Sequence, residues 1–270
     1  MRDKQQLLLV DGSGYIFRAF HALPPMTRGD GTPVNAVYGF TAMLMKLSDD
    51  MPPDHVAGVV DVARKTFRSD IYPDYKANRS EPPEELVPQF ALVREATAAL
   101  TLPAVELAGF EADDMIATYA AAAEAAGLAT TIVSSDKDLM QLVRGDVTML
   151  DPMKQRRIGA AEVVERFGVP PEKVVDVQAL AGDSTDNVPG VPGIGIKTAA
   201  ELITTYGDLE TLLARADEIK QPKRRENLLN FAEQARISRQ LVLLRDDAPM
   251  PLELAALKTP ARDMDRRIAF

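Results

Sequence analysis

The sequence contains no cysteine and only two histidines among its 270 residues. Disulfide bonds and thiolate zinc sites are therefore excluded, and imidazole groups can contribute little to metal binding. Any metal ion that this chain binds must be a hard cation held by oxygen atoms. A chain without cysteine is also typical of a reducing compartment, so we expect a cytoplasmic protein.

Long hydrophobic runs are absent as well. No apolar run approaches the roughly 18 residues needed to cross a membrane, so no membrane partner is expected. The start, MRDKQQLLLVDG, has an apolar run of only four residues and no small-residue cleavage site, which argues against a signal peptide. The end, DMDRRIAF, lacks a helix stop, so the native chain is expected to continue beyond it. Nothing in the composition predicts more than a monomer.

Three short apolar runs each lead into aspartate. LLLVD ends at Asp11, VAGVVD ends at Asp61, and TTIVSSDKD contains Asp136 and Asp138. Continuous apolar runs of this length are typical of strands buried on both faces of a parallel sheet. Ligands of such sheets bind at the carboxyl ends of the strands, so these aspartates are expected to converge on one edge.

Helical patterns lie between and after these runs, and VTMLD at 147–151 predicts a last strand. The alternation predicts an α/β fold with a doubly wound, mostly parallel central sheet. Beyond residue 151 the pattern is helical. We expect an α/β core at 1–175 and a helical subdomain at 176–270, with helices near 35–47, 84–100, 111–126 and through 208–247.

Carboxylates are concentrated rather than spread. The net charge is −9, and nine acidic residues near the predicted strand ends account for all of it. A set placed at successive strand ends suits two hard divalent ions about 4 Å apart, which activate water and stabilise the leaving oxygen in phosphodiester hydrolysis. Mg²⁺ retains several water ligands, so many of the nine would act indirectly. The nine are Asp11, Asp61, Glu111, Asp113, Asp114, Asp136, Asp138, Asp183 and Asp186.

The stretch GFEADD crowds Glu111, Asp113 and Asp114 at the start of a predicted helix. Two unit charges about 4 Å apart repel by about 4 kcal/mol at an effective dielectric constant near 20. A helix N-terminus offsets only about 0.3–1 kcal/mol per acid. We therefore expect divalent cations between or beside these carboxylates, and we expect Mg²⁺ to stabilise the fold.

Other chemistries fit the sequence less well. The DGSG turn lacks the third glycine of a dinucleotide loop because Phe17 stands there, and no phosphate-binding P-loop occurs. Ser134 and Ser135 lie beside acids but have no histidine base for triad chemistry. His21 and His55 have no partner pattern, so we interpret both as structural or surface residues.

Two segments are suited to a phosphate backbone, although the net charge alone argues against nucleic acid. Residues 63–79 interleave basic and aromatic side chains, which can contact phosphates and stack on bases. GVPGIGIKTA is a glycine-rich turn that opens a helix, where backbone N–H groups and the helix dipole favour an anion. The candidates are Arg64, Lys65, Arg68, Tyr75, Lys76 and Arg79 in the first segment, and Gly193, Gly195, Lys197 and Thr198 in the second.

Six motifs together resemble the 5′-nuclease (flap endonuclease) domain of bacterial DNA polymerase I. They are LVDGSGYIFRAFHAL, TPVNAVYGF, YKANR, GFEADD, SSDKDL and GDSTDNVPGVPGIGIKTA. The resemblance runs from about residue 7 to the C-terminus. It implies a resolvase-like (PIN-like) core, a helical arch at about 62–100 that threads the 5′ strand, and a helix-two-turns-helix motif at about 188–207 that holds duplex.

The family also implies roles for individual residues. Asp11, Asp61, Glu111, Asp113 and Asp114 resemble its first metal cluster, and Asp136, Asp138, Asp183 and Asp186 its second. Arg18 matches a residue near the scissile phosphate, Lys76 and Arg79 match the base of the arch, and Tyr38 and Phe40 lie in a motif expected to contact DNA. The cofactors implied are two or more Mg²⁺, with Mn²⁺ as a substitute, and a K⁺ at the glycine turn.

The family's activity is structure-specific, metal-dependent cleavage of DNA 5′ ends and flaps in replication and repair, with RNA primer hybrids as further substrates. No polymerase segment is present, so this chain alone is not expected to synthesise DNA. A small-substrate phosphatase is a rival, but it needs neither the basic-aromatic segment nor the glycine turn. A non-catalytic DNA-binding module is the other rival; an incomplete carboxylate set would support it, and all nine are present.

Overall fold

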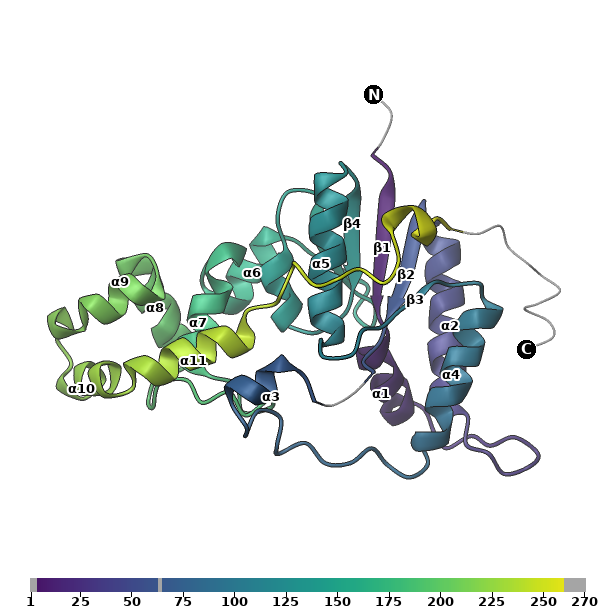
Figure 1. The fold of residues 1–270 in the computed structure, drawn as a ribbon, viewed down its shortest axis with the longest axis horizontal. Helices are drawn as coiled ribbons and strands as arrows, with labels where there is room; N and C mark the ends of the chain where they lie inside the picture. The colour runs from purple at the N-terminus through teal and green to yellow at the C-terminus, as the bar shows by residue number, and fades with distance from the viewer. Residues whose placement is uncertain (1–3, 63–64, 260–270) are drawn as a thin grey trace.

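The computed structural model describes residues 4–62 and 65–259 of the chain. Its centre is a six-stranded sheet in the order β3-β2-β1-β4-β5-β6 (Figure 1). All neighbouring strands pair in parallel except β5 and β6, which are antiparallel. The strands are β1 (Gln6–Asp11), β2 (His55–Val59), β3 (Ala104–Val105), β4 (Ala129–Val133), β5 (Val147–Asp151) and β6 (Arg156–Ile158).

Helices separate and follow these strands. Those among the strands are α1 (Gly12–Ala22), α2 (Asn35–Asp50), α3 (Phe67–Ile71), α4 (Val87–Ala99), α5 (Ala112–Ala125) and the 3₁₀ helix η1 (Asp138–Leu142). Those after β6 are α6 (Ala160–Phe167), η2 (Pro171–Lys173), α7 (Val174–Ala181), α8 (Ile196–Tyr206), α9 (Leu209–Ala214), η3 (Ala216–Glu218), α10 (Pro222–Asn230), α11 (Ala232–Val242) and η4 (Leu254–Leu257).

Strand β1 shows why the apolar runs form a parallel sheet covered on both faces. Leu7 and Leu9 pack into a core that includes α5, whereas Leu8 and Val10 pack into a core built from α1, α2 and α4. Successive side chains of a strand point to opposite faces, so a continuous apolar run buries both. The predicted doubly wound α/β fold is confirmed.

The chain order places β1 at a topological switch point. Strand β1 pairs with β2 on one side and with β4 on the other, and the connections leave in opposite directions. Helix α1 starts directly after Asp11, and α5 covers the other face of the sheet (Figure 1). In open α/β sheets the crevice beyond such strand ends is where ligands bind.

The helices after β6 share a core with the sheet. Ile203 and Leu212 lie in the same buried cluster as Ile132 of β4. After α11 the chain returns across α5 toward the sheet, as the yellow trace in Figure 1 shows. Tyr119 of α5 fixes this return by donating its hydroxyl to the carbonyl oxygen of Leu252 at 2.6 Å.

Several predicted boundaries need correction. The strand predicted at 147–151 is β5, but it is not the last, because β6 follows it. Strand β3 was not predicted; two residues carry no readable periodicity. The predicted boundary between residues 175 and 176 falls inside α7, so the division into 1–175 and 176–270 does not coincide with a loop.

The arch predicted at about 62–100 is only partly available for that role. Val93 and Ala96 of α4 are buried in the same core as β1, so residues 87–99 cover the sheet and do not form part of an arch. The segment before α4 contains the short helix α3 followed by turns. Arg64 and the terminal DMDRRIAF lie outside the described residues.

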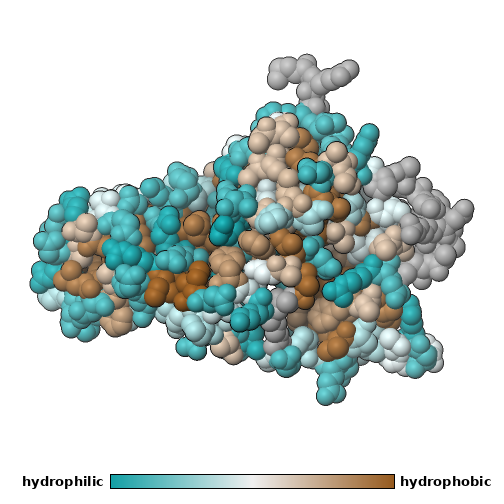
Figure 2. Space-filling view, viewed as in Figure 1, coloured by the Kyte–Doolittle hydropathy of each residue, from teal (hydrophilic) through white to brown (hydrophobic). Residues whose placement is uncertain are grey.

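The molecular surface in the view of Figure 2 is mainly hydrophilic, and hydrophobic residues appear there in small separate groups. Among the described residues, no helix combines the length and apolarity needed to span a membrane.

Candidate metal centre and nucleic-acid surface

Asp11 ends β1 and caps α1. Its Oδ1 accepts a hydrogen bond from the Gly14 N–H at 2.8 Å, and its Oδ2 accepts one from the Ser134 hydroxyl at 2.7 Å. A side chain at position 14 would put its Cβ 2.4 Å from Oδ2 of Asp11. The glycine of DGSG therefore serves close approach to a carboxylate, which explains the motif without a dinucleotide.

Asp61 lies two residues beyond β2 and contacts the start of α5. Its Oδ1 accepts a hydrogen bond from the Ala112 N–H at 2.8 Å, and its own N–H donates to the Ser13 hydroxyl at 3.0 Å. These bonds join the ends of β1 and β2 to the acidic helix start, so the convergence predicted from the apolar runs is present in the fold.

Glu111 lies opposite Asp186, with Lys76 between them. The ammonium of Lys76 is 2.8 Å from Oε2 of Glu111 and 3.5 Å from Oδ2 of Asp186. Tyr75 donates its hydroxyl to the same two carboxylates, and Arg79 pairs with Asp186. The pKa of Lys76 is raised: burial alone would lower it, but the charges of Glu111 and Asp186 prevail.

The remaining carboxylates follow β4 and α7. The Asp138 N–H donates to Oδ1 of Asp136 at 2.9 Å, and Gln178 donates its amide to Oδ1 of Asp138 at 2.5 Å. Lys137 forms an ion pair with Asp183. Burial would raise the pKa of Asp183, but the hydrogen bond from Lys137 lowers it below its usual value.

Burial and mutual repulsion raise the pKa of three of these carboxylates. The pKa of Asp11 is raised to about 6, first by burial and then by the charges of Asp136 and Asp61. The pKa of Asp138 is also raised to about 6, first by burial and then by Asp136. Burial, Asp136 and Asp11 raise the pKa of Asp113 well above its usual value. A nearby cation would relieve all three.

We call the eight carboxylates that meet here the acidic rim: Asp11, Asp61, Glu111, Asp113, Asp136, Asp138, Asp183 and Asp186. Five of them line one small cavity, and Leu241, Val242 and Leu244 line it as well. A larger apolar cavity of about 140 Å³ lies between α2 and β2 and has no acidic residue in its lining.

The acidic rim fits hard cations, although it is not a finished ligand cage. Among the described residues, no three acidic or histidine side chains are arranged to hold one ion as they stand. Lys76 and Lys137 lie against the carboxylates instead. Mg²⁺ keeps most of its waters and takes one or two carboxylates directly, so a three-residue cage is not required. Gln178 Oε1, buried and unpartnered among these residues, is an acceptor that such a water could satisfy.

Four of the predicted site residues are buried in other roles. Asp114 is 0% exposed and bonded to the guanidinium of Arg68, itself 1% exposed, so neither the metal role of Asp114 nor the DNA role of Arg68 is correct. Phe40 of α2 is 1% exposed and packs in the core formed by α1, α2 and α4. Tyr75 is also buried, and its hydroxyl donates a hydrogen bond to Glu111. Neither aromatic ring is available to stack on a base.

The other predicted DNA contacts are accessible. Arg18, Lys65 and Lys197 are exposed, and Tyr38 is 58% exposed. Gly193 and Gly195 form the turn before α8, and Thr198 lies in its first turn. Lys65 makes one weak exposed pair with Asp70, at 3.8 Å. The prediction that these residues contact DNA stands as a prediction.

Three residues near the acidic rim were missed as site residues. Ser134 hydrogen-bonds both Asp11 and the Asp136 N–H, Lys137 pairs with Asp183, and Gln178 holds Asp138. The SSDKD motif contains the first two, so their proximity to acids was visible in the sequence. Gln178 lies on α7, and no sequence signal connected it to residue 138.

The family comparison agrees with this geometry. The model of the 5′-3′ exonuclease N-terminal resolvase-like domain matches residues 6–168, and that of the 5′-3′ exonuclease C-terminal SAM fold matches residues 169–265. The chain belongs to the 5′-3′ exonuclease family. Its two family units meet at residue 168/169, in the turn that follows α6.

The curated relatives of the chain are longer proteins. The chain is 58% identical over its whole length to DNA polymerase I of Rhizobium leguminosarum, of which it covers 27%. It is 41% identical over 99% of its length to DNA polymerase I of Bacillus caldotenax, of which it covers 31%. The chain thus spans less than a third of these curated relatives.

A solved structure shares the fold. The phage T5 flap endonuclease, in a pseudo-enzyme-product complex with DNA and metal ions, has a TM-score of 0.75 and 23% sequence identity. The match covers 88% of this chain and 89% of that one.

The raised pKa values predict how the metal-free protein responds to pH. Asp11 has a pKa of about 6 in the fold against an ordinary 3.8, so the folded state holds its proton more tightly than the unfolded state. The contribution of Asp11 to the free energy of unfolding is therefore largest below pH 4. It falls by about 3 kcal/mol as the pH rises toward 7. Carboxylates with lowered pKa, such as Asp183, are already ionised in this range.

Thermal melts in EDTA between pH 4 and 7 measure this effect. The melting temperature is expected to fall with rising pH, more weakly in Asp11→Asn, and Mg²⁺ is expected to restore stability at pH 7 by binding the ionised carboxylates. A melting temperature that rises through this range in EDTA would contradict the arrangement of charges described here.

Proposed function

We propose that this chain is a divalent-metal-dependent 5′-3′ exonuclease and flap endonuclease that hydrolyses DNA phosphodiesters at 5′ ends and flaps. The observation that carries the proposal is the acidic rim at the carboxyl edge of the sheet, with Lys76 between Glu111 and Asp186. Family membership supports the reaction class, and the T5 structure with DNA and metal ions is the same fold.

The carboxylates fall into two groups that would hold Mg²⁺, with Mn²⁺ as a substitute. We propose that Glu111, Asp113 and Asp11 hold one ion, and that Asp138 and Asp183 hold the other. When bound, such ions supply a nucleophilic water at neutral pH and charge stabilisation at the leaving oxygen. The chain's contribution is to hold the acids at fixed positions through the Ser134, Gln178 and backbone bonds.

Lys76 and Arg79 would bind the phosphate beside the acidic rim. Both are paired with Asp186, and their segment is fastened to the Asp186 loop by the Lys76 N–H, which donates to the Asp186 carbonyl oxygen at 2.9 Å. A cation that enters between Glu111 and Asp186 would repel the ammonium and make it available to a phosphate oxygen. Exposed Arg18 on α1 would serve as a further phosphate contact near the end of β1.

The helical unit would hold the duplex part of the substrate. The turn at Gly193 and Gly195 exposes backbone N–H groups at the start of α8, and Lys197 is exposed beside them. Such a helix start binds the phosphate backbone without reading sequence. A K⁺ bound at this turn would strengthen the contact. We propose that Lys65 and Tyr38 contact the single-stranded part.

The biological setting follows from the relatives. We propose that the chain acts as a monomer in the cytoplasm, as the N-terminal part of a DNA polymerase I, removing RNA primers and damaged 5′ ends. The polymerase activity would belong to the remainder of such a protein, since the chain covers 27% of the Rhizobium relative.

A flap substrate tests the proposal directly. Nicked duplex with a 5′-labelled flap is incubated with the protein in Mg²⁺, in Mn²⁺ and in EDTA. Cleavage near the junction is expected with either metal, and its rate in EDTA is expected to fall by at least about 10³-fold because the ions supply several kcal/mol of transition-state stabilisation.

Binding of the flap without cleavage in either metal would favour a non-catalytic DNA-binding module on the same scaffold. Cleavage of a small phosphate ester at a comparable rate, with no preference for flap DNA, would favour a phosphatase instead.

A further inference from the structure

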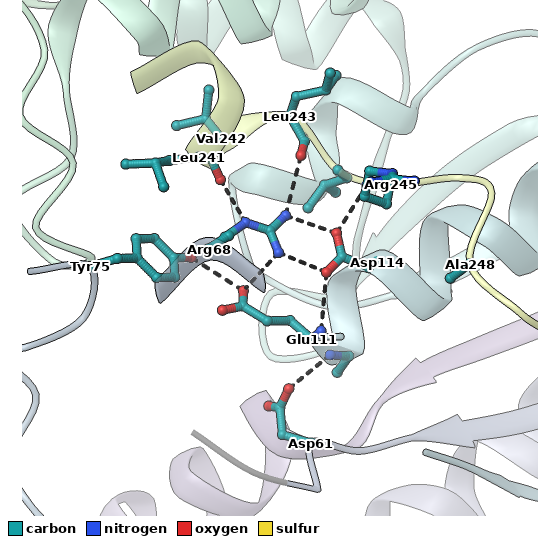
Figure 3. Close-up of polar contacts among 12 residues, drawn as sticks. Asp61, Arg68, Tyr75, Glu111, Asp114, Leu241, Val242, Leu243, Arg245 and Ala248 are labelled. Atoms are coloured by element: carbon teal, nitrogen blue, oxygen red, sulfur yellow. Dashed lines mark hydrogen bonds and ion pairs between the residues drawn. The ribbon is translucent and has the colours of Figure 1, made fainter. Parts of the chain in front are cut away.

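The guanidinium of Arg68 is buried where three distant segments meet (Figure 3). It donates to the carbonyl oxygens of Leu241 at 2.7 Å and Leu243 at 3.2 Å. Its Nη1 and Nη2 donate to the two oxygens of Asp114 at 2.7 and 2.8 Å. A buried charge is tolerated only when it is paired and hydrogen-bonded in this way.

The carboxylate of Asp114 has no capacity left for an ion. Its Oδ1 accepts from Arg68 and from the Arg245 N–H at 2.9 Å, and its Oδ2 accepts from Arg68 and from the Glu111 N–H at 3.0 Å. An ionised carboxylate offers about four acceptor sites, so all are used. Although Asp114 is a direct neighbour of Asp113, the two carboxylates therefore have different functions.

The pair also fixes Glu111, the carboxylate next to Lys76. Asp114 holds the main chain of Glu111, and Nη1 of Arg68 lies 3.7 Å from its Oε2. Tyr75, four residues after the end of α3, donates its hydroxyl to that same Oε2 at 3.2 Å. Asp114 thus holds the backbone of Glu111, while Arg68 and Tyr75 contact its carboxylate.

We infer that Arg68 and Asp114 form a buried tether that positions Glu111 for metal binding. This inference rests on the proposed metal-dependent function. It makes both members of the pair positioning residues, which act through Glu111 and contact neither DNA nor metal. Groups that orient metal ligands in this way typically contribute about 10–100-fold to metal affinity or activity.

Electrostatics and positioning predict opposite results for Arg68→Met. The guanidinium is a positive charge close to Glu111, so its removal alone would strengthen the attraction of the acidic rim for Mg²⁺. Loss of the tether would instead let Glu111 move and weaken Mg²⁺ binding. The sign of the change therefore separates the two explanations.

The experiment uses Arg68→Met and the double variant Arg68→Met/Asp114→Leu. The double variant removes both charges, so the net charge is unchanged and no buried charge is left unpaired. Apolar replacement of a buried ion pair is commonly tolerated, so the double variant is expected to fold even if the single variant does not. Leu212→Ala in α9 is the control for a loss of stability. It alters a fully buried side chain remote from the acidic rim and is expected to destabilise the fold as the tether variants do.

Two readouts are compared across the variants: the Mg²⁺ concentration for half-maximal flap cleavage, and the Mg²⁺ midpoint for thermal stabilisation of the DNA-free protein. Both are expected to rise about 10–100-fold in the tether variants, with cleavage recovering at high Mg²⁺. Leu212→Ala is expected to lower the melting temperature and leave both midpoints unchanged.

The possible outcomes are distinct. Unchanged or lower midpoints in the tether variants would overturn the inference and leave the pair a packing feature. Loss of Mg²⁺ binding at every concentration in the double variant would overturn it in favour of Asp114 as a direct ligand. A wild type that never cleaves would remove the proposed function, while the thermal midpoints would still decide whether the tether positions Glu111.

Discussion

Asp113→Ala is expected to lower the rate of flap cleavage at saturating Mg²⁺ by about 10³-fold, which corresponds to about 4 kcal/mol of transition-state stabilisation. Asp113 lines the cavity of the acidic rim, and among the described residues its carboxylate makes no hydrogen bond or ion pair. Burial and the charges of Asp136 and Asp11 raise its pKa, so a carboxylate there is costly unless a cation accompanies it.

The same substitution is expected to stabilise the metal-free protein at pH 7, since it removes a buried, repelled charge. Rates under single-turnover conditions and melting temperatures in EDTA measure the two effects. Glu124→Ala is the matched control: it lies on the same helix, removes the same charge, and breaks an exposed pair with Arg144 worth about 0–1 kcal/mol. Metal-dependent cleavage by Asp113→Ala within tenfold of wild type would refute the metal role of this residue.

The strands and the acidic rim were accessible from sequence because both arise from local patterns. LLLVD, VAGVVD and VTMLD correspond to β1, β2 and β5, and the aspartates follow from where those strands end. Their convergence required only the rule that parallel strands present their carboxyl ends at one edge. Eight of the nine predicted carboxylates meet there.

Asp114 and Arg68 were assigned wrongly because their environment is built by distant segments. The partner carbonyl of Leu241 is 173 residues from Arg68 in the chain. The basic-aromatic pattern of residues 63–79 cannot show that one of its arginines points inward. For Asp114 a local signal existed: it occupies the third helical position after Glu111, where an acid bonds back to the N-cap backbone.

The prediction that Phe40 contacts DNA overlooked a helical pattern that the sequence contains. Ala36, Val37, Phe40, Leu44 and Leu47 recur at helical spacing and are all buried on one face of α2. That period predicts a core position, whereas Tyr38, off the stripe, is exposed. The aromatic residues of one motif therefore divide by helix face into core and surface.

Gly190→Ala is expected to lower the free energy of unfolding by about 2–5 kcal/mol, from a left-handed backbone that costs about 1–2 kcal/mol and a clash that costs about 1–3 kcal/mol. Gly190 has φ of +61°, and an added Cβ would lie 2.4 Å from the backbone nitrogen of Gly182. The loop cannot move aside easily, because the Gly190 N–H donates to Ser238 at 2.9 Å and its carbonyl accepts from Gln234 at 2.6 Å.

Gly182 and Gly190 approach each other at the base of the loop that carries Asp183 and Asp186. Backbone hydrogen bonds between Asp183 and Val188 join the two ends of this loop. Gly190→Ala is therefore expected to displace both carboxylates and reduce Mg²⁺-dependent cleavage along with stability. Gly193→Ala is the matched control, since φ is +77° there but the nearest atom to an added Cβ is 3.8 Å away. Its expected cost is the backbone term alone, about 1–2 kcal/mol. Urea denaturation of the two variants separates the terms, and equal losses of stability would show that the contact with Gly182 does not constrain the loop.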